Sequence, residues 1–265
     1  MRRVLQCVFP SPLPTAIRRL FPALASDAPP VSAGYEPIPP EDLSRVVAEL
    51  ADAWKSPGLA VAQLEVVTAE LDAFARGEPI PVYDVFIRLL ARIPDVGTKS
   101  LLEVGCSSGY YADVLRLRDI RTKFAGCDFA SEFVTLARRR FPSVDFRVED
   151  ATRLGYGDAS WDIVVSGCCI LHIPNYPAAI REAARVARSW VLFHRTPVIH
   201  TTPTRYYRKL AYGVSCIEIH FNETELLDLF RAAGLRLVDA ETVGVGGQAP
   251  AGDVQVMKSY LCAKS

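Results

Sequence analysis

The sequence has no apolar stretch long enough to cross a bilayer and no net charge, since 30 Lys and Arg side chains balance 30 Asp and Glu. A neutral chain argues against a protein that mainly coats nucleic acid or an anionic membrane. Half of its 265 residues are hydrophobic and 23% are charged, which excludes global disorder. We therefore expect a globular protein with a substantial core, and neither a nucleic acid nor a membrane as its partner.

The sequence also lacks any Cys-x-x-Cys pair, and its 7 cysteines are odd in number. Most of them lie in apolar runs, where a reduced and buried thiol is the ordinary state. The arginines at positions 2 and 3 imitate the start of a secretory signal, but Pro10, Pro12 and Pro14 interrupt the apolar core that a signal needs. These features favour a reducing compartment, and we expect a cytoplasmic protein.

Residues 1–40 differ from the rest of the chain because they hold 9 of the 19 prolines. Proline fixes its own φ and lacks an amide donor, so we expect an extended arm with a short helix near residues 15–24. The arm could be a loosely held tail, a lid, or a docking site for a second copy or a partner protein. Apolar residues at helical spacing then predict a helical extension over residues 41–97, with helices near 43–54, 59–76 and 82–93.

From residue 98 to the end, strand and helix patterns alternate. Strands are expected at 100–104, 123–128, 144–148, 161–166, 190–194, 235–243 and 256–263, with helices at 109–118, 131–141, from 177 and from 223. Ser131 is the expected N-cap of one helix, and Asn222 with Glu225 has the spacing of a capping box. The pattern predicts an α/β fold: a Rossmann-like, seven-stranded, mainly parallel sheet with helices on both faces. Because no helix separates the last two strands, we expect the last one to run antiparallel.

A glycine-rich turn follows the first strand of this sheet, within residues 101–111. Gly105 lets the backbone pass close to a ligand, and ligands of open parallel sheets bind at the carboxyl ends of strands. Asp128 ends the next strand, 19 residues beyond the last glycine of the turn, where a carboxylate can accept two hydrogen bonds from a ribose diol. After the third strand, Asp150 could accept from an adenine amino group while the amide of Ala151 donates to a ring nitrogen.

The turn lacks the Gly-x-Gly-x-x-Gly spacing of a dinucleotide site, and Ser107 stands where a second glycine would approach a pyrophosphate. The pattern therefore favours an adenosyl group without a pyrophosphate. Over residues 98–264 the chain resembles the class I S-adenosylmethionine-dependent methyltransferases of the small-molecule type. The resemblance rests on four segments in this order: residues 103–109, 126–130, 149–151, and 161–166 followed by Leu171 and His172.

The resemblance implies S-adenosylmethionine as the cofactor and assigns it a set of contacts. The implied residues are Glu103, Gly105, Cys106, Ser107 and Gly109 around the methionine part, Asp128 and Phe129 at the ribose and adenine, Asp150 and Ala151 at the adenine edge, Ser166 and Gly167 at the amino group, and Tyr83 closing over the pocket. Taken singly, Glu103 could instead interact with the dipole of the following helix, Asp128 could cap the next helix, and Asp150 could be a solvated turn residue.

All 4 histidines lie in the second half of the chain. An alcohol or phenol acceptor must lose a proton, and histidine is the natural base near neutral pH. His172, after the fourth strand, is our first candidate, followed by His194 at the end of the fifth strand and His220 before the capped helix. Each could equally be a structural histidine bonded to the backbone. Their spacing matches no common metal-ligand motif, so no metal is expected.

The segment 196–219 joins aromatic and cationic side chains between the fifth strand and the capped helix. It suits a cover over an anionic or aromatic substrate, or else a basic amphipathic surface helix. We expect an enzyme that methylates a small molecule such as a metabolite, a natural product or a sugar intermediate. Two alternatives stay open: a cofactor-binding scaffold without catalysis, and a nucleic-acid or protein methyltransferase. The second is disfavoured because residues 166–169 lack an Asn-Pro-Pro-Tyr-like motif.

Overall fold

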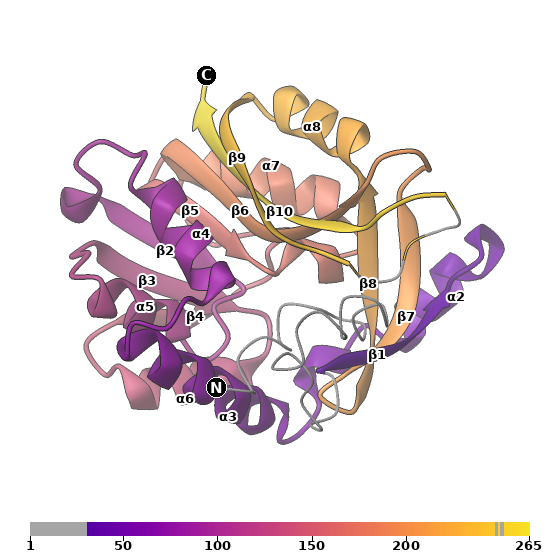
Figure 1. Cartoon of the computed structure of the whole chain (residues 1–265), viewed down its shortest axis with the longest axis horizontal. Helices are drawn as coiled ribbons and strands as arrows, with labels where there is room; N and C mark the ends of the chain where they lie inside the picture. The colour runs from indigo at the N-terminus through magenta and orange to yellow at the C-terminus, as the bar shows by residue number, and fades with distance from the viewer. Residues whose placement is uncertain (1–30, 247–248, 250–251) are drawn as a thin grey trace.

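A twisted, mainly parallel sheet forms the centre of the computed structural model, which describes residues 31–246, 249 and 252–265 (Figure 1). Its seven principal strands are β2 (Ser100–Val104), β3 (Lys123–Asp128), β4 (Asp145–Val148), β5 (Trp161–Gly167), β6 (Ala187–Ile199), β9 (Leu235–Val245) and β10 (Val256–Lys264). Their order across the sheet is β4-β3-β2-β5-β6-β10-β9. β10 runs antiparallel to both of its neighbours, β6 and β9, and the other neighbouring pairs among the seven are parallel. The expected α/β fold and the antiparallel last strand are confirmed.

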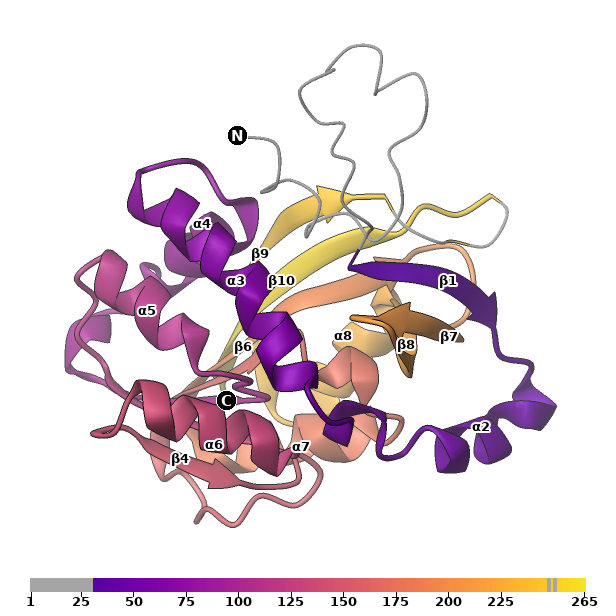
Figure 2. The same ribbon diagram turned by 90° about the horizontal axis from the view of Figure 1, so that it is seen from below.

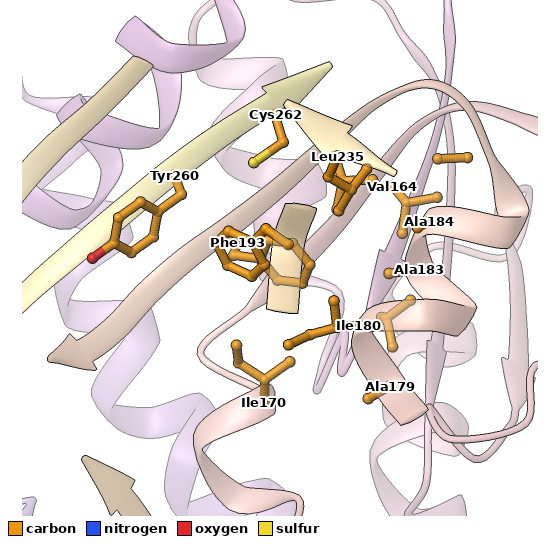
Figure 3. Close-up of a cluster of buried hydrophobic side chains, with 14 of the residues drawn as sticks. Val164, Ile170, Ala179, Ile180, Ala183, Ala184, Phe193, Leu235, Tyr260 and Cys262 are labelled. Atoms are coloured by element: carbon orange, nitrogen blue, oxygen red, sulfur yellow. The ribbon is translucent and has the colours of Figure 1, made fainter. Parts of the chain in front are cut away.

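Helices cover both faces of this sheet, which explains why its central strands are apolar throughout. The helices are α2 (Leu43–Glu49), α3 (Leu59–Ala75), α4 (Pro81–Leu90), α5 (Tyr110–Leu117), α6 (Ser131–Arg140), α7 (Tyr176–Val186) and α8 (Glu223–Ala232), with single 3₁₀ turns at Pro40–Asp42, Ala53–Lys55, Val96–Thr98 and Ile170–His172. In β5, Ile163 packs in the core under α3, α4 and α5, whereas Val164 packs in the core under α7 and α8. Figure 3 shows the second core, where Ile180 and Ala183 of α7 face Phe193 of β6.

Three further strands extend the sheet, so it has ten strands in the described part of the chain rather than the seven expected. They are β1 (Ser32–Pro37), β7 (Arg205–Ala211) and β8 (Val214–Asn222). The last residues of β8 pair in parallel with the last residues of β6, and α8 follows directly after β8. β7 pairs antiparallel with β8, and β1 pairs antiparallel with β7. Figures 1 and 2 both show this addition on the opposite side of the molecule from α5 and α6.

The hairpin of β7 and β8 corrects our interpretation of residues 196–219, because the amphipathic-helix alternative is wrong there. Only Tyr212 and Gly213 separate the two strands, and both have positive φ angles, of 51° and 80°. Two consecutive residues of this kind form the tight turn that matches the twist of paired strands. The Tyr-Gly step between these two strands was the sequence signal that we missed.

The N-terminal part also differs in detail from expectation. The helix expected over residues 43–54 is shorter, since α2 ends at Glu49 and only a 3₁₀ turn follows. The short helix expected near residues 15–24 lies outside the described residues, as does most of the proline-rich arm. In the described ranges, none of the helices combines the length and apolarity that a bilayer-spanning helix requires. The six cysteines described are all free thiols, as expected.

The two expected helix caps have different outcomes. Asn222 is the N-cap of α8, and its side chain accepts a hydrogen bond from the amide of Glu225 at 3.1 Å. The carboxylate of Glu225 does not return to Asn222 but accepts from the Thr204 hydroxyl at 2.6 Å, so only half of the capping box forms. The prediction for Ser131 is wrong by one position, because Ala130 is the N-cap of α6.

Candidate functional site

A cavity of about 440 Å³ lies at the carboxyl ends of β2, β3 and β5, next to Arg195 of β6. This edge is where open α/β sheets bind ligands. Helix α3 contributes Gln63 and Glu70 to the wall, and the β7–β8 hairpin contributes Lys209 and Glu218. The cavity is therefore bounded by the core sheet, by the helical extension before it and by the hairpin inserted after β6.

The turn after β2 brings the backbone close to the cavity. Gly105 has φ +76°, and a Cβ added there would lie 2.6 Å from the Cys169 Sγ atom. Ser107, at φ 50°, adopts a left-handed conformation that is uncommon for a residue with a side chain. Its hydroxyl donates a hydrogen bond to the Oε1 atom of Gln63, which places α3 directly over the turn. Because Gly105 has no side chain, Cys169 can pack directly against this turn.

We expect Gly105→Ala to lower the free energy of unfolding by about 2–4 kcal/mol, because it adds both left-handed strain and overlap with Cys169. Gly77 offers a matched control, since it has φ +82° but no atom within 4 Å of an added Cβ. Gly77→Ala should therefore cost only the strain, about 1–2 kcal/mol. Urea denaturation of both variants measures the difference. Equal losses would contradict the close approach of Cys169 to the turn.

Asp128 lies at the end of β3, faces the cavity and holds the turn in place. Its Oδ2 atom accepts from the amide of Ser107 at 2.8 Å, and its Oδ1 atom accepts from the amide of Ala130 at 3.0 Å. Burial raises the pKa of this carboxyl, although the two amide hydrogen bonds oppose the shift. Each carboxylate oxygen keeps a second lone pair that could accept from a hydroxyl in the cavity. The structural and the ligand-binding interpretations of Asp128 are therefore compatible.

The cavity continues past Asp128 to the residues that follow β4. Phe129 is 40% exposed, and the Lys55 ammonium lies 3.8 Å from the centre of its ring. The Asp150 carboxylate accepts hydrogen bonds from the amide and the hydroxyl of Thr152, both at 2.8 Å. These bonds fix the turn that contains Ala151. Phe129, Asp150, Ala151 and Thr152 all line this part of the cavity.

Seven residues of the predicted cofactor set line the cavity: Gly105, Ser107, Asp128, Phe129, Asp150, Ala151 and Gly167. Five do not, namely Glu103, Cys106, Gly109, Ser166 and Tyr83. Glu103 is only 1% exposed, and burial raises the pKa of its carboxyl well above the usual range. Tyr83 is fully buried and donates a hydrogen bond to Glu70 at 3.0 Å. The structure therefore does not place Tyr83 as a cover over the pocket, and it is Glu70 that reaches the cavity.

Of the three candidate bases, His172 alone lines the cavity. Its Nδ1 atom lies 2.7 Å from the carbonyl oxygen of Ile217, which can only accept, so Nδ1 carries the proton and Nε2 the lone pair. The ring packs against Trp54 with 4.5 Å between ring centres. Burial, followed by the nearby charge of Lys209, lowers the pKa of His172 to about 4. The imidazole is therefore neutral at physiological pH.

The other two histidines are packed away from the cavity. His194 is 1% exposed, and its Nδ1 atom is 2.8 Å from the hydroxyl of Ser259. His220 is fully buried, and its Nε2 atom is 2.9 Å from the Glu218 Oε1 atom. Because neither ring lines the cavity, the structure gives them structural surroundings and brings only His172 to the site.

Sequence reasoning missed a buried ion pair at the hairpin end of the cavity. Lys209 and Glu218 are 5% and 2% exposed and form an ion pair across β7 and β8. Burial alone would raise the pKa of Glu218, but Lys209 lowers it well below its usual range. The cross-strand register Tyr207↔Glu218 and Lys209↔Cys216 places the two side chains on one face as diagonal neighbours. That register could have been read only after the hairpin was recognised.

Comparisons with known proteins agree with this geometry. Residues 102–193 match the family model described as a methyltransferase domain. A probable S-adenosylmethionine-dependent methyltransferase of Mycolicibacterium smegmatis is 31% identical over 150 residues, which are 56% of this chain and 55% of that protein. One from Mycobacterium tuberculosis H37Rv is 32% identical over 163 residues, covering 57% of this chain and 59% of that protein. The chain thus matches little more than half the length of these curated relatives.

Solved structures support the fold. The 1,6-didemethyltoxoflavin-N1-methyltransferase of Burkholderia thailandensis, solved with 1,6-didemethyltoxoflavin and S-adenosylhomocysteine, has a TM-score of 0.53 and 19% identity. That similarity covers 87% of this chain and 95% of the other. The family match and the curated relatives agree with the resemblance carried by the four sequence segments: residues 102–193 match a methyltransferase domain, and the chain is similar to S-adenosylmethionine-dependent methyltransferases. S-adenosylmethionine is the cofactor named for both curated relatives, and the bare backbone at Gly105 and the carboxylate of Asp128 fit it.

Proposed function

We propose that this protein transfers the methyl group of S-adenosylmethionine to an oxygen atom of a small-molecule acceptor, with His172 as the general base. The observation that carries the proposal is the orientation of His172, whose ring lines the cavity while its Nδ1 proton is held by the carbonyl of Ile217. That hydrogen bond fixes the tautomer, so Nε2 is the atom that can accept a proton.

The proposed cofactor contacts follow the ends of neighbouring strands. Asp150 and the amide of Ala151 would bind the adenine edge, Asp128 would accept from the ribose hydroxyls, and the backbone at Gly105 and Gly167 would hold the methionine part. When bound, the cofactor supplies a methyl group that its sulfonium already activates. The remaining part of the cavity, beside His172, is then available to the acceptor.

The chain contributes alignment and proton removal. Holding the acceptor oxygen in line with the methyl carbon and the sulfur can supply roughly 7–11 kcal/mol of the barrier reduction. As the new O–C bond forms and the C–S bond breaks, the electron pair of the broken bond stays on sulfur. The acceptor proton passes to the Nε2 atom of His172, which is neutral and ready to accept it.

The shape of the cavity supports a small acceptor. Its volume of about 440 Å³ lies within the range of small-molecule sites, and α3 and the hairpin close it on two sides. We also propose a cytoplasmic location, because the six described cysteines are free thiols, as is usual in reducing compartments. Dimerisation or partner docking through the proline-rich arm remains a proposal from composition alone.

Two measurements test the proposed function. Calorimetry should show that the full chain binds S-adenosylhomocysteine, and incubation with S-adenosylmethionine and pooled metabolites should release S-adenosylhomocysteine and an O-methylated product, detected by mass spectrometry. Binding without turnover in any pool would support the scaffold alternative. Turnover only with added RNA, DNA or protein would contradict the small-molecule acceptor, and no binding of either compound would overturn the proposal as a whole.

A further inference from the structure

A β-bulge near the end of β6 directs Arg195 toward the cavity. The pairing of β6 with β10 shifts by one residue, so that His194 and Arg195 together lie opposite Ser259. Arg195 has φ 59°, in the left-handed region, which is uncommon for a residue with a side chain. The shift also explains why Phe193 and Val198, five positions apart, belong to the same core cluster. Bulges of this kind re-aim a side chain, and here Arg195 lines the cavity.

Arg195 is a cation that makes no close ion pair within the described part of the chain. In the described ranges, two cationic side chains line the cavity, Arg195 and Lys209. Lys209 is paired with Glu218, and its ammonium also donates to the Ser32 hydroxyl at 3.0 Å. Arg195 forms no ion pair with any described residue, and its Nε atom is buried without a hydrogen-bond acceptor. Because a guanidinium stays charged, an unpaired one in a cavity wall is costly until an anion arrives.

Other groups around Arg195 complete a receptor for an anion. Tyr110 lines the cavity and Tyr111 packs beside it, with 4.6 Å between the ring centres. Burial raises the pKa of both phenols well above the usual range, so both keep their protons, and Tyr110, which lines the cavity, can donate there. The carboxylate of Glu70 also lines the cavity and interacts with Arg195 over a longer range, while accepting from Tyr83. Glu70 sets one boundary of the space that an anion could occupy.

The position of Arg195 assigns this anion to the acceptor rather than to the cofactor. The proposed cofactor contacts use the ends of β4, β3, β2 and β5, in that order across the sheet. Arg195 lies on β6, one strand further on, toward the hairpin. Past it, the wall holds the Lys209–Glu218 ion pair and the apolar and aromatic side chains of Leu50, Trp54 and Ile217. One end of an acceptor in this part of the cavity would therefore contact Arg195, and the rest of the acceptor would pack against Leu50, Trp54 and Ile217.

Building on the proposed function, we propose that the methyl acceptor is an organic acid whose carboxylate pairs with Arg195. A guanidinium can bind a carboxylate through two parallel hydrogen bonds, so it both holds and orients the acceptor. With the carboxylate at Arg195 and the apolar body against Trp54, the acceptor hydroxyl would approach His172, because the Trp54 and His172 rings are in contact. Arg195 is then the residue that selects acids over neutral analogues.

The test compares acids with their neutral amides. The full chain is titrated, with and without S-adenosylhomocysteine, with formate, acetate and 4-hydroxybenzoate, and with formamide, acetamide and 4-hydroxybenzamide. We expect at least one acid to raise the melting temperature at a concentration about tenfold lower than its amide. Arg195→Gln should remove this difference and Arg195→Lys should retain part of it. Arg121→Gln, at a side chain that is 83% exposed, should leave the difference unchanged.

Two outcomes would overturn the inference. The first is that no acid stabilises the wild-type chain more than its amide, a result that does not depend on how well any variant folds. The second is that Arg195→Gln lowers the affinity for S-adenosylhomocysteine about tenfold but leaves the affinity for decarboxylated S-adenosylmethionine unchanged. Arg195 would then bind the carboxylate of the cofactor and not that of the acceptor. Failure of the wild-type chain to bind S-adenosylhomocysteine would overturn the proposed function instead, and the acid and amide titrations without it would still decide the role of Arg195.

Discussion

Asp128→Ala is expected to weaken the binding of S-adenosylhomocysteine by about 10–100-fold, as measured by calorimetry. The substitution removes the carboxylate that would accept from the ribose hydroxyls. It also releases the amides of Ser107 and Ala130, which the same carboxylate now holds at 2.8 and 3.0 Å, so the turn under the cofactor loses its anchor. Hydrogen bonds to charged groups are worth about 1.5–3 kcal/mol each, which sets the size of the effect.

A second ligand separates the two roles of Asp128. The analogue of S-adenosylhomocysteine without the ribose hydroxyls should bind the wild-type chain weakly, and Asp128→Ala should weaken it by a smaller factor than it weakens S-adenosylhomocysteine, because only the loss of the anchor of the turn then acts. Asp145→Ala is the control, since that carboxylate is half exposed and pairs with Arg147 outside the cavity. If both ligands lose the same factor in Asp128→Ala, the carboxylate holds the turn and does not contact the ribose.

The sheet could be predicted from the sequence because its strands are local signals. The bounds of β2 and β3 are those expected. Each is a short, mostly apolar run that begins at a polar residue and ends at a residue of the cavity wall. The β7–β8 hairpin could not be predicted in the same way. Its residues alternate charged, aromatic and small side chains, and the charged Lys209 and Glu218 lie on the buried face. A half-buried strand is recognised because apolar residues alternate with polar ones and occupy its buried face. In this hairpin the buried face carries an ion pair, so the expected alternation is absent.

The site was predictable where it depends on strand ends and unpredictable where it depends on packing. Asp128 and Asp150 follow parallel strands, whose carboxyl ends meet at one edge, so spacing in the sequence implies proximity in space. Gln63 and Glu70 reach the same cavity from α3, and no local pattern indicates which face of that helix lies over the turn. Arg195 could not be placed at the site from the sequence, because a one-residue bulge exchanges the faces of a strand and leaves no clear trace in the sequence.

The same limit applies to the choice among the histidines. In the sequence, His172 follows the fourth expected strand and His194 ends the fifth, so sequence position could not separate them. The bulge holds the ring of His194 against Ser259 and the aromatic side chains Phe86 and Tyr111. His172 is free of that constraint, since it lies in the 3₁₀ turn Ile170–His172, and its ring reaches across to the hairpin. The inserted hairpin therefore both closes the cavity and supplies the carbonyl that fixes the tautomer of His172.

His172→Ala is expected to lower kcat by about 10²–10⁴-fold, the usual contribution of a positioned general base, with the affinity for S-adenosylhomocysteine unchanged. The cofactor contacts lie on other strands, so a loss confined to kcat separates proton removal from cofactor binding. Added imidazole should restore part of the activity of His172→Ala, because it can occupy the vacated space and accept the proton. Steady-state kinetics with S-adenosylhomocysteine release as the signal measures both effects, and His200→Ala, at an exposed histidine outside the cavity, is the control.

The pH dependence gives an independent test of the same role. Since the pKa of His172 is lowered to about 4, its imidazole is the neutral base at every pH above that value and becomes protonated below it. The turnover of the wild-type chain should therefore stay level with respect to this group from pH 8 down to about 5 and fall as the pH approaches about 4. His172→Ala should lose that acidic limb. A wild-type profile that instead falls with a midpoint near the ordinary histidine value of about 6.5 would contradict a buried, neutral base at this position.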